Sequence, residues 1–138
     1  MKKHYEEVYD FIDRFPFNPQ WSYYFAIERA GYFYVLALRD EGFLVGYIGL
    51  ILSPMLHTQT CLRARGDSFY LRPEWRGSVG LSSIFLRAIK ECERRMRELG
   101  VHRIEWVPKR RGGQHVDSGP VFKRLGYVEV EYVFAKLL

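Results

Sequence analysis

The sequence predicts an α/β domain with a mixed, mostly antiparallel central sheet and helices on both faces. Runs rich in β-branched and aromatic residues alternate with segments in which apolar residues recur every three or four positions. A charged turn that ends in glycine, at residues 39–42, joins two of the β-prone runs as a hairpin. A long amphipathic helix separates two later strands, which predicts that these two strands run parallel.

The elements follow the order ααβββαβαβ. Asn18, followed by Pro19, is expected to cap the second helix, and Gly100 is expected to end the long one. Gly66 lies inside the third strand and predicts a bulge or a bend there. One apolar stripe on the long helix is expected to be buried, formed by Leu81, Phe85, Ala88, Cys92, Met96 and Leu99. The predicted helices are residues 4–15, 18–31, 79–99 and 118–125, and the predicted strands are 32–38, 43–52, 61–71, 101–107 and 127–137.

The composition is that of a globular protein. The chain has 138 residues, of which 48% are hydrophobic, so residues 1–138 are expected to fold as a single domain. No apolar run approaches the ~18 residues of a membrane span, and the N-terminus lacks the apolar core of a signal peptide, which indicates a cytoplasmic protein. Two cysteines, Cys61 and Cys92, are too few for a disulfide framework or a zinc site, so no metal is expected.

The most specific chemistry in the sequence is an anion site at the start of the long helix. The third strand ends at Pro73, and the helix begins within a turn that holds Arg76, Gly77 and Gly80. A helix N-terminus carries unpaired N–H donors and a positive dipole end, and glycine lets a ligand approach the backbone. The turn therefore predicts a site for a phosphate or pyrophosphate, with a solvated turn as the alternative.

This arrangement resembles the GNAT superfamily of N-acetyltransferases. Three segments carry the likeness, and together they span residues 67–138: LRPEWRGSVGLSSIFL, RELGVHRIEWVP and GPVFKRLGYVEVEYVFAKLL. The first is similar to a looser, phage-like form of the family's acetyl-CoA motif. Counted from Arg76, the two positions where the family has small residues hold Val79 and Leu81, and the glycines are Gly77 and Gly80. The first strand usual in the family is not evident, because the chain begins with a predicted helix.

The resemblance implies acetyl-CoA as cosubstrate. It places the pyrophosphate on backbone N–H groups of the turn and of the first helical turn, with charge from Arg76. It places the pantetheine arm beside the end of the third strand, in a gap between two splayed parallel strands, where an N–H near Leu71 faces the developing oxyanion. The cofactor-binding residues that it implies are Phe69, Tyr70, Leu71, Arg76, Gly77, Ser78, Val79, Gly80, Leu81 and Ser82.

The implied reaction is transfer of the acetyl group to a primary amine by direct attack, which needs a base for the ammonium proton. Asp67, on the third strand, is the first candidate and Glu105, on the neighbouring strand, is the second. Either could instead be a strand-end carboxylate in a salt bridge. Phe122 stands where the family has its tyrosine acid, so the acid would be Ser118, Tyr132 or water. A catalytically inactive CoA-binding relative is therefore an alternative.

A small basic nucleic-acid-binding protein is the alternative of a different class. The net charge of +5 suits it as well as it suits a phosphorylated ligand. Glutamates interleave the basic residues of the long helix, which favours ion pairs within the helix and makes nucleic acid the weaker reading. Those basic residues are Arg87, Lys90, Arg94 and Arg97, followed by a second cluster at residues 109–111.

The acceptor is expected to be a small-molecule amine or a protein amine. Its recognition is expected to lie in the N-terminal helices and in loops at residues 53–60 and 108–117. The sequence does not decide whether the protein forms a homodimer through its last strand.

Overall fold

The fold is known from a computed structural model, which describes residues 1–9, 11–76, 83–108, 119–131 and 136. The chain divides into two compact units. Phe17–Val107 forms the larger unit, and Met1–Pro16 together with Pro108–Leu138 forms the smaller one. The single domain over residues 1–138 stays a prediction.

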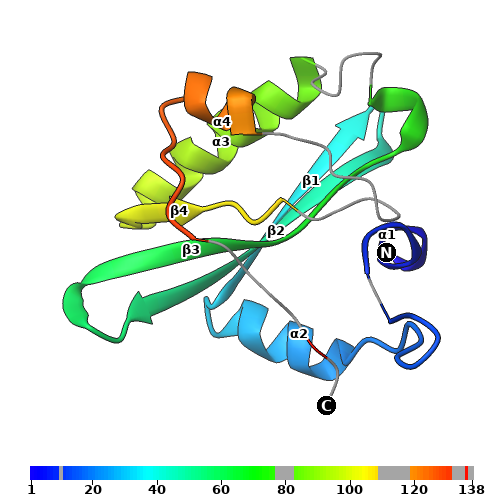
Figure 1. The fold of residues 1–138 in the computed structure, drawn as a ribbon, viewed down its shortest axis with the longest axis horizontal. Coiled ribbons are helices and arrows are strands. Elements are labelled where there is room, and N and C mark those ends of the chain that lie inside the picture. Colours follow the sequence, from blue (N-terminus) through cyan, green and yellow to red (C-terminus); the bar gives the residue numbers. More distant parts are fainter. Residues whose placement is uncertain (10, 77–82, 109–118, 132–135, 137–138) are drawn as a thin grey trace. The chain divides into compact units, whose positions relative to one another are not determined.

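The larger unit is built on a four-stranded sheet of order β1-β2-β3-β4. The first three strands are antiparallel and β4 is parallel to β3, which confirms the mixed, mostly antiparallel sheet. Helix α2 lies over one face and α3 over the other, as Figure 1 shows. The elements are α2 (Trp21–Arg29), β1 (Phe33–Asp40), β2 (Phe43–Met55), β3 (Thr58–Leu71), the 3-10 turn η1 (Pro73–Trp75), α3 (Ser83–Glu98) and β4 (Arg103–Glu105).

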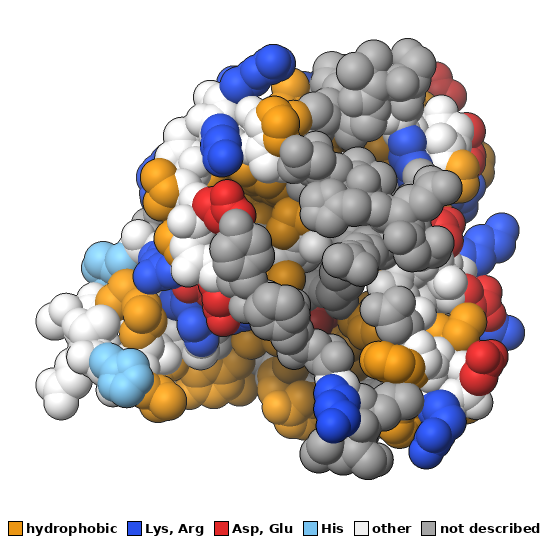
Figure 2. All heavy atoms as spheres, in the orientation of Figure 1, with side chains coloured by type: hydrophobic (Ala, Val, Ile, Leu, Met, Phe, Trp, Pro, Cys, Tyr) orange, Lys and Arg blue, Asp and Glu red, His pale blue; other side chains and the backbone are white. Residues whose placement is uncertain are grey.

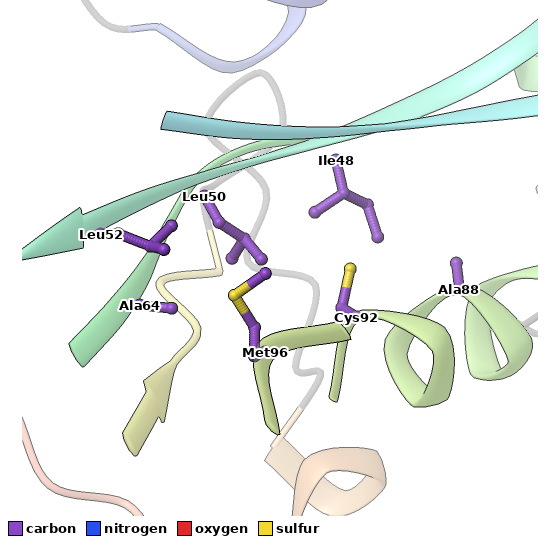
Figure 3. Close-up of a cluster of buried hydrophobic side chains, with 7 residues drawn as sticks. All are labelled: Ile48, Leu50, Leu52, Ala64, Ala88, Cys92 and Met96. Carbon is purple, nitrogen blue, oxygen red and sulfur yellow. The ribbon is translucent and has the colours of Figure 1, made fainter. Parts of the chain in front are cut away.

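The core of this unit fills the space between the sheet and α3 (Figure 3). Alternate residues of β2 point toward α3, and the helix presents residues spaced by four toward them. The buried cluster consists of Ile48, Leu50, Leu52, Ala64, Ala88, Cys92 and Met96, each at most 6% exposed. The predicted stripe is therefore confirmed at Ala88, Cys92 and Met96.

Leu99 was expected to be buried, and this expectation is wrong. The side chain is 51% exposed because α3 ends at Glu98 and Leu99 lies in the terminating turn. Gly100 does end the helix as predicted, with φ +72. Its N–H donates to the carbonyl of Arg97 (3.1 Å), and the next N–H, of Val101, donates to Met96 (2.9 Å), which is a Schellman cap.

The hairpin between β1 and β2 is tighter than predicted. The strands continue to Asp40 and from Phe43, so only Glu41 and Gly42 form the turn. Both have positive φ, 46 and 86 respectively, as the two-residue turns that match strand twist require.

The predicted loop at residues 53–60 is wrong. β2 continues through Pro54 to Met55, and β3 already begins at Thr58, so this segment is a second tight hairpin. Pro54 is tolerated because β1 does not extend beside it: the first residue of β1, Phe33, pairs with Ile51. The N–H of Leu52 donates to Tyr32 on the β1 side, and residue 54 has the same orientation, so its missing N–H breaks no pairing with β3.

The bounds predicted for the two N-terminal helices are partly wrong. α1 (Lys2–Val8) ends before residue 15, because Tyr9 is extended and Phe11 has φ 65. α2 begins at Trp21 with Gln20 as its N-cap, so Asn18 does not cap it.

In the smaller unit, α4 (Gly119–Arg124) closes at Gly126 as predicted. Residues 127–131 of the predicted last strand are not in a strand, and residues 132–135, 137 and 138 lie outside the described residues. Within the described ranges, no helix is long and apolar enough to cross a membrane.

Candidate functional site

A bulge interrupts β3 at its middle. Leu50 pairs with Gly66, but the preceding Gly49 pairs with Ser68, so Asp67 is an extra residue in the strand. This confirms the bulge predicted at Gly66. A bulge bends its strand and increases the local twist, so β3 changes direction at Asp67.

The parallel strand β4 ends beside this bulge. Arg63 pairs with Arg103 and Arg65 pairs with Glu105, which is the last pair of the ladder. The next residue, Trp106, lies against Gly66. A β-carbon at Gly66 would lie 3.1 Å from Cε3 of the indole ring and 3.5 Å from the carbonyl oxygen of Glu105. Glycine therefore leaves room for the tryptophan at the point where the two strands separate.

Beyond this point β3 presents an open backbone edge. The N–H of Arg72 donates to Val45 of β2 at 2.9 Å, and antiparallel pairing alternates, so the N–H groups of Leu71 and Phe69 point away from β2. Among the described residues of this unit, no strand pairs with that side of residues 67–71. The carbonyl of Leu71 does have a partner there, Nε of Arg76, at 2.6 Å. The ladder between β3 and β4 thus ends at Glu105, and beyond it the N–H groups of Phe69 and Leu71 have no strand partner among the described residues. We call the space beside these N–H groups the gap.

The side chains along this edge are anchored on the two faces of the sheet. Phe69 packs edge-on against Phe85 of α3, with ring centroids 4.8 Å apart, and Leu71 is buried. Tyr70 points to the opposite face, where its ring lies 5.7 Å from that of Tyr47. The side chains of this edge of β3 therefore pack on both faces of the sheet, while its backbone N–H groups point along the plane of the sheet.

Arg76 lies just after β3 and η1. Besides its bond to the Leu71 carbonyl, its guanidinium stands 5.3 Å from the centroid of the Tyr70 ring. Its charge is thus fixed next to the open edge. The other cofactor-binding residues predicted in this turn and at the start of the long helix lie outside the described residues: Gly77, Ser78, Val79, Gly80, Leu81 and Ser82.

The two acidic candidates have different surroundings. Asp67 is half-buried at the bulge, and its carboxylate makes no ion pair or hydrogen bond with the described residues. The side chain of Glu105 is only 9% exposed. Its Oε1 lies 2.9 Å from Nε of Arg103, and its Oε2 lies 3.6 Å from both Arg63 and Arg65.

Glu105 is therefore a strand carboxylate in salt bridges, which is the alternative stated for it above, but the identity of its three arginine partners was not anticipated from the sequence. The signal was present as Arg-x-Arg at residues 63–65 and Arg-x-Glu at 103–105, since a period of two places alternate residues of a strand on one face. Finding them requires the register in which these strands pair, and the sequence does not show that register. We call this group the arginine cluster: Arg63, Arg65, Arg103 and Glu105.

The two residues predicted as candidates for the general acid, Ser118 and Tyr132, lie outside the described residues. Phe122 is half-buried on α4, with its ring centroid 5.5 Å from that of Tyr127.

Arg94, Arg95 and Arg97 form ion pairs within α3. Arg94 pairs with Glu91 and with Glu98, and Arg97 pairs with Glu93. The hydrogen bond from Arg94 lowers the pKa of Glu91 to about 2. On the face that Figure 2 shows, basic side chains of described residues stand among acidic and apolar ones. The ion pairs of Arg94 and Arg97 agree with the predicted solvated face of this helix. The second basic cluster, at residues 109–111, lies outside the described residues.

Burial raises the pKa of the Cys92 thiol to about 12, which disfavours the reactive thiolate. Among the described residues, no cluster of His, Cys, Asp or Glu side chains could hold a metal ion.

No protein-family profile matches the sequence, and no curated protein matches it. Solved structures do match. An aminoglycoside acetyltransferase from an uncultured soil metagenomic sample is 15% identical over 98% of this chain and 85% of its own, with a TM-score of 0.70. A GNAT family acetyltransferase of Staphylococcus aureus is 19% identical over 96% and 85%, with a TM-score of 0.64. A predicted acetyltransferase of Clostridium acetobutylicum, solved with acetyl-CoA, is 14% identical over 87% and 79%, with a TM-score of 0.63. The chain has the fold of the GNAT acetyltransferases.

Proposed function

We propose that this protein transfers an acetyl group from acetyl-CoA to a primary amine. The observation that carries the proposal is the open edge of β3 at residues 67–71, where β4 has separated and the N–H groups of Phe69 and Leu71 face the gap. A thioester carbonyl in this gap would meet a fixed backbone donor where negative charge develops during attack. Neighbours in fold include acetyltransferases, and one of these was solved with acetyl-CoA.

Acetyl transfer forms a C–N bond and breaks the C–S bond of the thioester. The ammonium group of the acceptor must first lose a proton, and we assign its removal to Asp67, directly or through a water. Asp67 is preferred to Glu105 because the described residues leave its carboxylate without an ion pair, whereas the carboxylate of Glu105 is shared by three arginines. After attack the nitrogen loses its second proton as the amide forms, and the leaving thiolate takes one proton from Tyr132 or from water; the second nitrogen proton replaces the one given to the thiolate.

The residues present suit the cosubstrate. Phe69, Tyr70 and Leu71 offer an extended backbone along which the amide groups of a pantetheine arm can bond as a further strand would. Arg76 supplies a fixed positive charge at the end of that edge. The pyrophosphate is proposed to bind the backbone of residues 77–82, which carry the glycines of the sequence motif.

Calorimetric titration with acetyl-CoA tests the cofactor. Wild type is expected to bind, Gly80→Trp is expected to lose binding because the indole fills the space of the pyrophosphate, and Gln59→Trp in the distant hairpin is the matched control. Absence of binding to wild type would refute the cofactor. Equal binding by wild type and Gly80→Trp would refute the placement of the pyrophosphate.

The pH dependence of acetylation tests the base. Asp67→Asn is expected to lower kcat/KM for an amine by about 10²- to 10⁴-fold, the usual contribution of a positioned base. The control is Asp40→Asn in the exposed β1–β2 hairpin, which should leave the rate unchanged. An Asp67→Asn enzyme with the wild-type rate and pH profile would exclude Asp67. Binding of acetyl-CoA by wild type without turnover of any amine would favour the inactive relative that Phe122 raises.

A further inference from the structure

The arginine cluster lies on the sheet face opposite α3, directly before the gap. Ala64 and Ile104, which pair with each other, belong to the core against α3. Their neighbours Arg63, Arg65 and Glu105 alternate with them and so point to the other face. The pair of Arg65 and Glu105 is the last one before the strands separate, so the cluster borders the gap.

Positive charge is in excess within this cluster. Arg65 interacts with a further group besides Glu105, so Arg65 is left out when the charges of the cluster are summed. Arg63 and Arg103 still share the single carboxylate of Glu105. Two cations share one anion, so one positive charge stays uncompensated among the described residues. Solvent screens these charges little, because the Glu105 side chain is only 9% exposed.

The polar atoms of the cluster are also incompletely used. Nε of Arg63 and Oε2 of Glu105 are buried and make no hydrogen bond. Arg63 makes one weak bond, from Nη2 to Oγ of Ser53 at 3.4 Å, and Arg103 is still 41% exposed. Guanidinium groups bind carboxylates and phosphates through paired N–H donors, so an anionic group suits the exposed parts of Arg103 and of Arg63, whose side chain is 29% exposed.

We infer that the arginine cluster binds an anionic group, carboxylate or phosphate, carried by the amine acceptor. The inference rests on the proposed acetyltransferase function, which places the acceptor's amine at the gap. In this arrangement Glu105 holds the arginines in place, and Arg63 and Arg103 contact the anion. The acceptor is then a small amine that also bears a negative charge, such as an amino acid or a phosphorylated amine.

Arginine side-chain N–H signals in NMR test the binding directly, without turnover. Protein labelled with ¹⁵N-arginine is titrated with inorganic phosphate and with acetate, against chloride at matched ionic strength. The Nε–H signals of Arg63 and Arg103 are expected to shift with a dissociation constant on the order of 1 mM, while that of Arg39 in the β1–β2 hairpin stays in place. The signal of Arg76 reports separately on CoA. If CoA moves Arg76 while neither anion moves Arg63 or Arg103, the inference fails and the proposed function stands. If the anions act but CoA does not, the proposed function fails while the anion site stands.

Matched acceptors test the role in specificity. β-Alanine is compared with propylamine, and phosphoethanolamine with ethanolamine, so that the two pairs separate carboxylate from phosphate. At least a tenfold preference in kcat/KM for the charged member of one pair is expected, and Arg103→Gln should abolish it while Arg39→Gln retains it. Equal use of charged and neutral amines by wild type would overturn the inference. If no amine of the set is acetylated, the NMR titration alone decides.

Discussion

Gly66→Ala is expected to destabilise the protein only while Trp106 is present. The added β-carbon would lie 3.1 Å from the indole, so the ring would have to move by a few tenths of an ångström. Overpacking of this kind costs about 1–3 kcal/mol, and the reduced entropy of the unfolded chain returns about 0.4–1 kcal/mol. We therefore expect a loss of about 1 kcal/mol in the free energy of unfolding.

Replacing Trp106 by Ala removes that obstacle. The nearest remaining atom is the carbonyl oxygen of Glu105 at 3.5 Å, an ordinary contact. In the Trp106→Ala background, Gly66→Ala should stabilise the protein by about 0.5 kcal/mol. The coupling between the two positions is then about 1.5 kcal/mol, well above the usual error of such cycles.

Urea unfolding followed by circular dichroism measures all four proteins. Gly49→Ala is the matched control, because its β-carbon would meet Oγ of Ser68 at 2.6 Å and the ring of Phe33 at 3.0 Å, away from Trp106. Its cost should be the same in both backgrounds. A cost of Gly66→Ala that does not depend on Trp106 would refute the role of the tryptophan where the strands separate.

Three further predictions concern the described core and caps. Gly100→Ala should lower the free energy of unfolding by about 1 kcal/mol, because φ +72 disfavours a side chain although space is open there, and Gly100→Asn should cost less; equal losses in thermal melts would contradict this. Ile48→Ala should cost about 2–5 kcal/mol, since Ile48 is fully buried, whereas Ile51→Ala, 41% exposed on the other face, should cost far less in the same urea assay. The pKa of the Cys92 thiol is about 12 in the folded state and about 9 in the unfolded state. Between these pH values only the unfolded state loses the proton, so the free energy of unfolding should fall above pH 9 by up to about 1.4 kcal/mol per pH unit. Cys92→Ala should remove that part of the slope, and a thiol reagent at pH 8 should modify Cys61 but reach Cys92 only on unfolding; rapid modification of both would exclude a buried thiol.

The elements that the sequence predicts well are those with a local signal. The stripe through Ala88, Cys92 and Met96 and the cap at Gly100 depend only on helical spacing and on glycine's access to positive φ. The parallel direction of β4 follows from the long crossover helix. The bulge near Gly66 could also be predicted, although not that Asp67 is the extra residue.

The features that the sequence missed depend on tertiary context. Pro54 and the polar residues around it suggest a loop, but β2 accepts Pro54 because β1 does not extend beside it and so needs no N–H from this residue. Asn18 has the chemistry of a helix cap, yet the helix begins three residues later, at Trp21. The arginine cluster depends on the register between β3 and β4, which only the folded sheet defines.

The connectivity of the sheet also bears on the order in which it forms and opens. β1, β2 and β3 are joined by two tight turns, so many of their pairs lie close in sequence, whereas Arg103 of β4 pairs with Arg63, 40 positions away in the sequence (103 − 63). Closing the longer segment loses more chain entropy, and only three residue pairs of β4 offset that loss. β4 is therefore expected to join the sheet last and to exchange its amide hydrogens first. One wall of the gap is then the least protected strand of the sheet, and a ligand that contacts both walls adds stability where the sheet has least of its own.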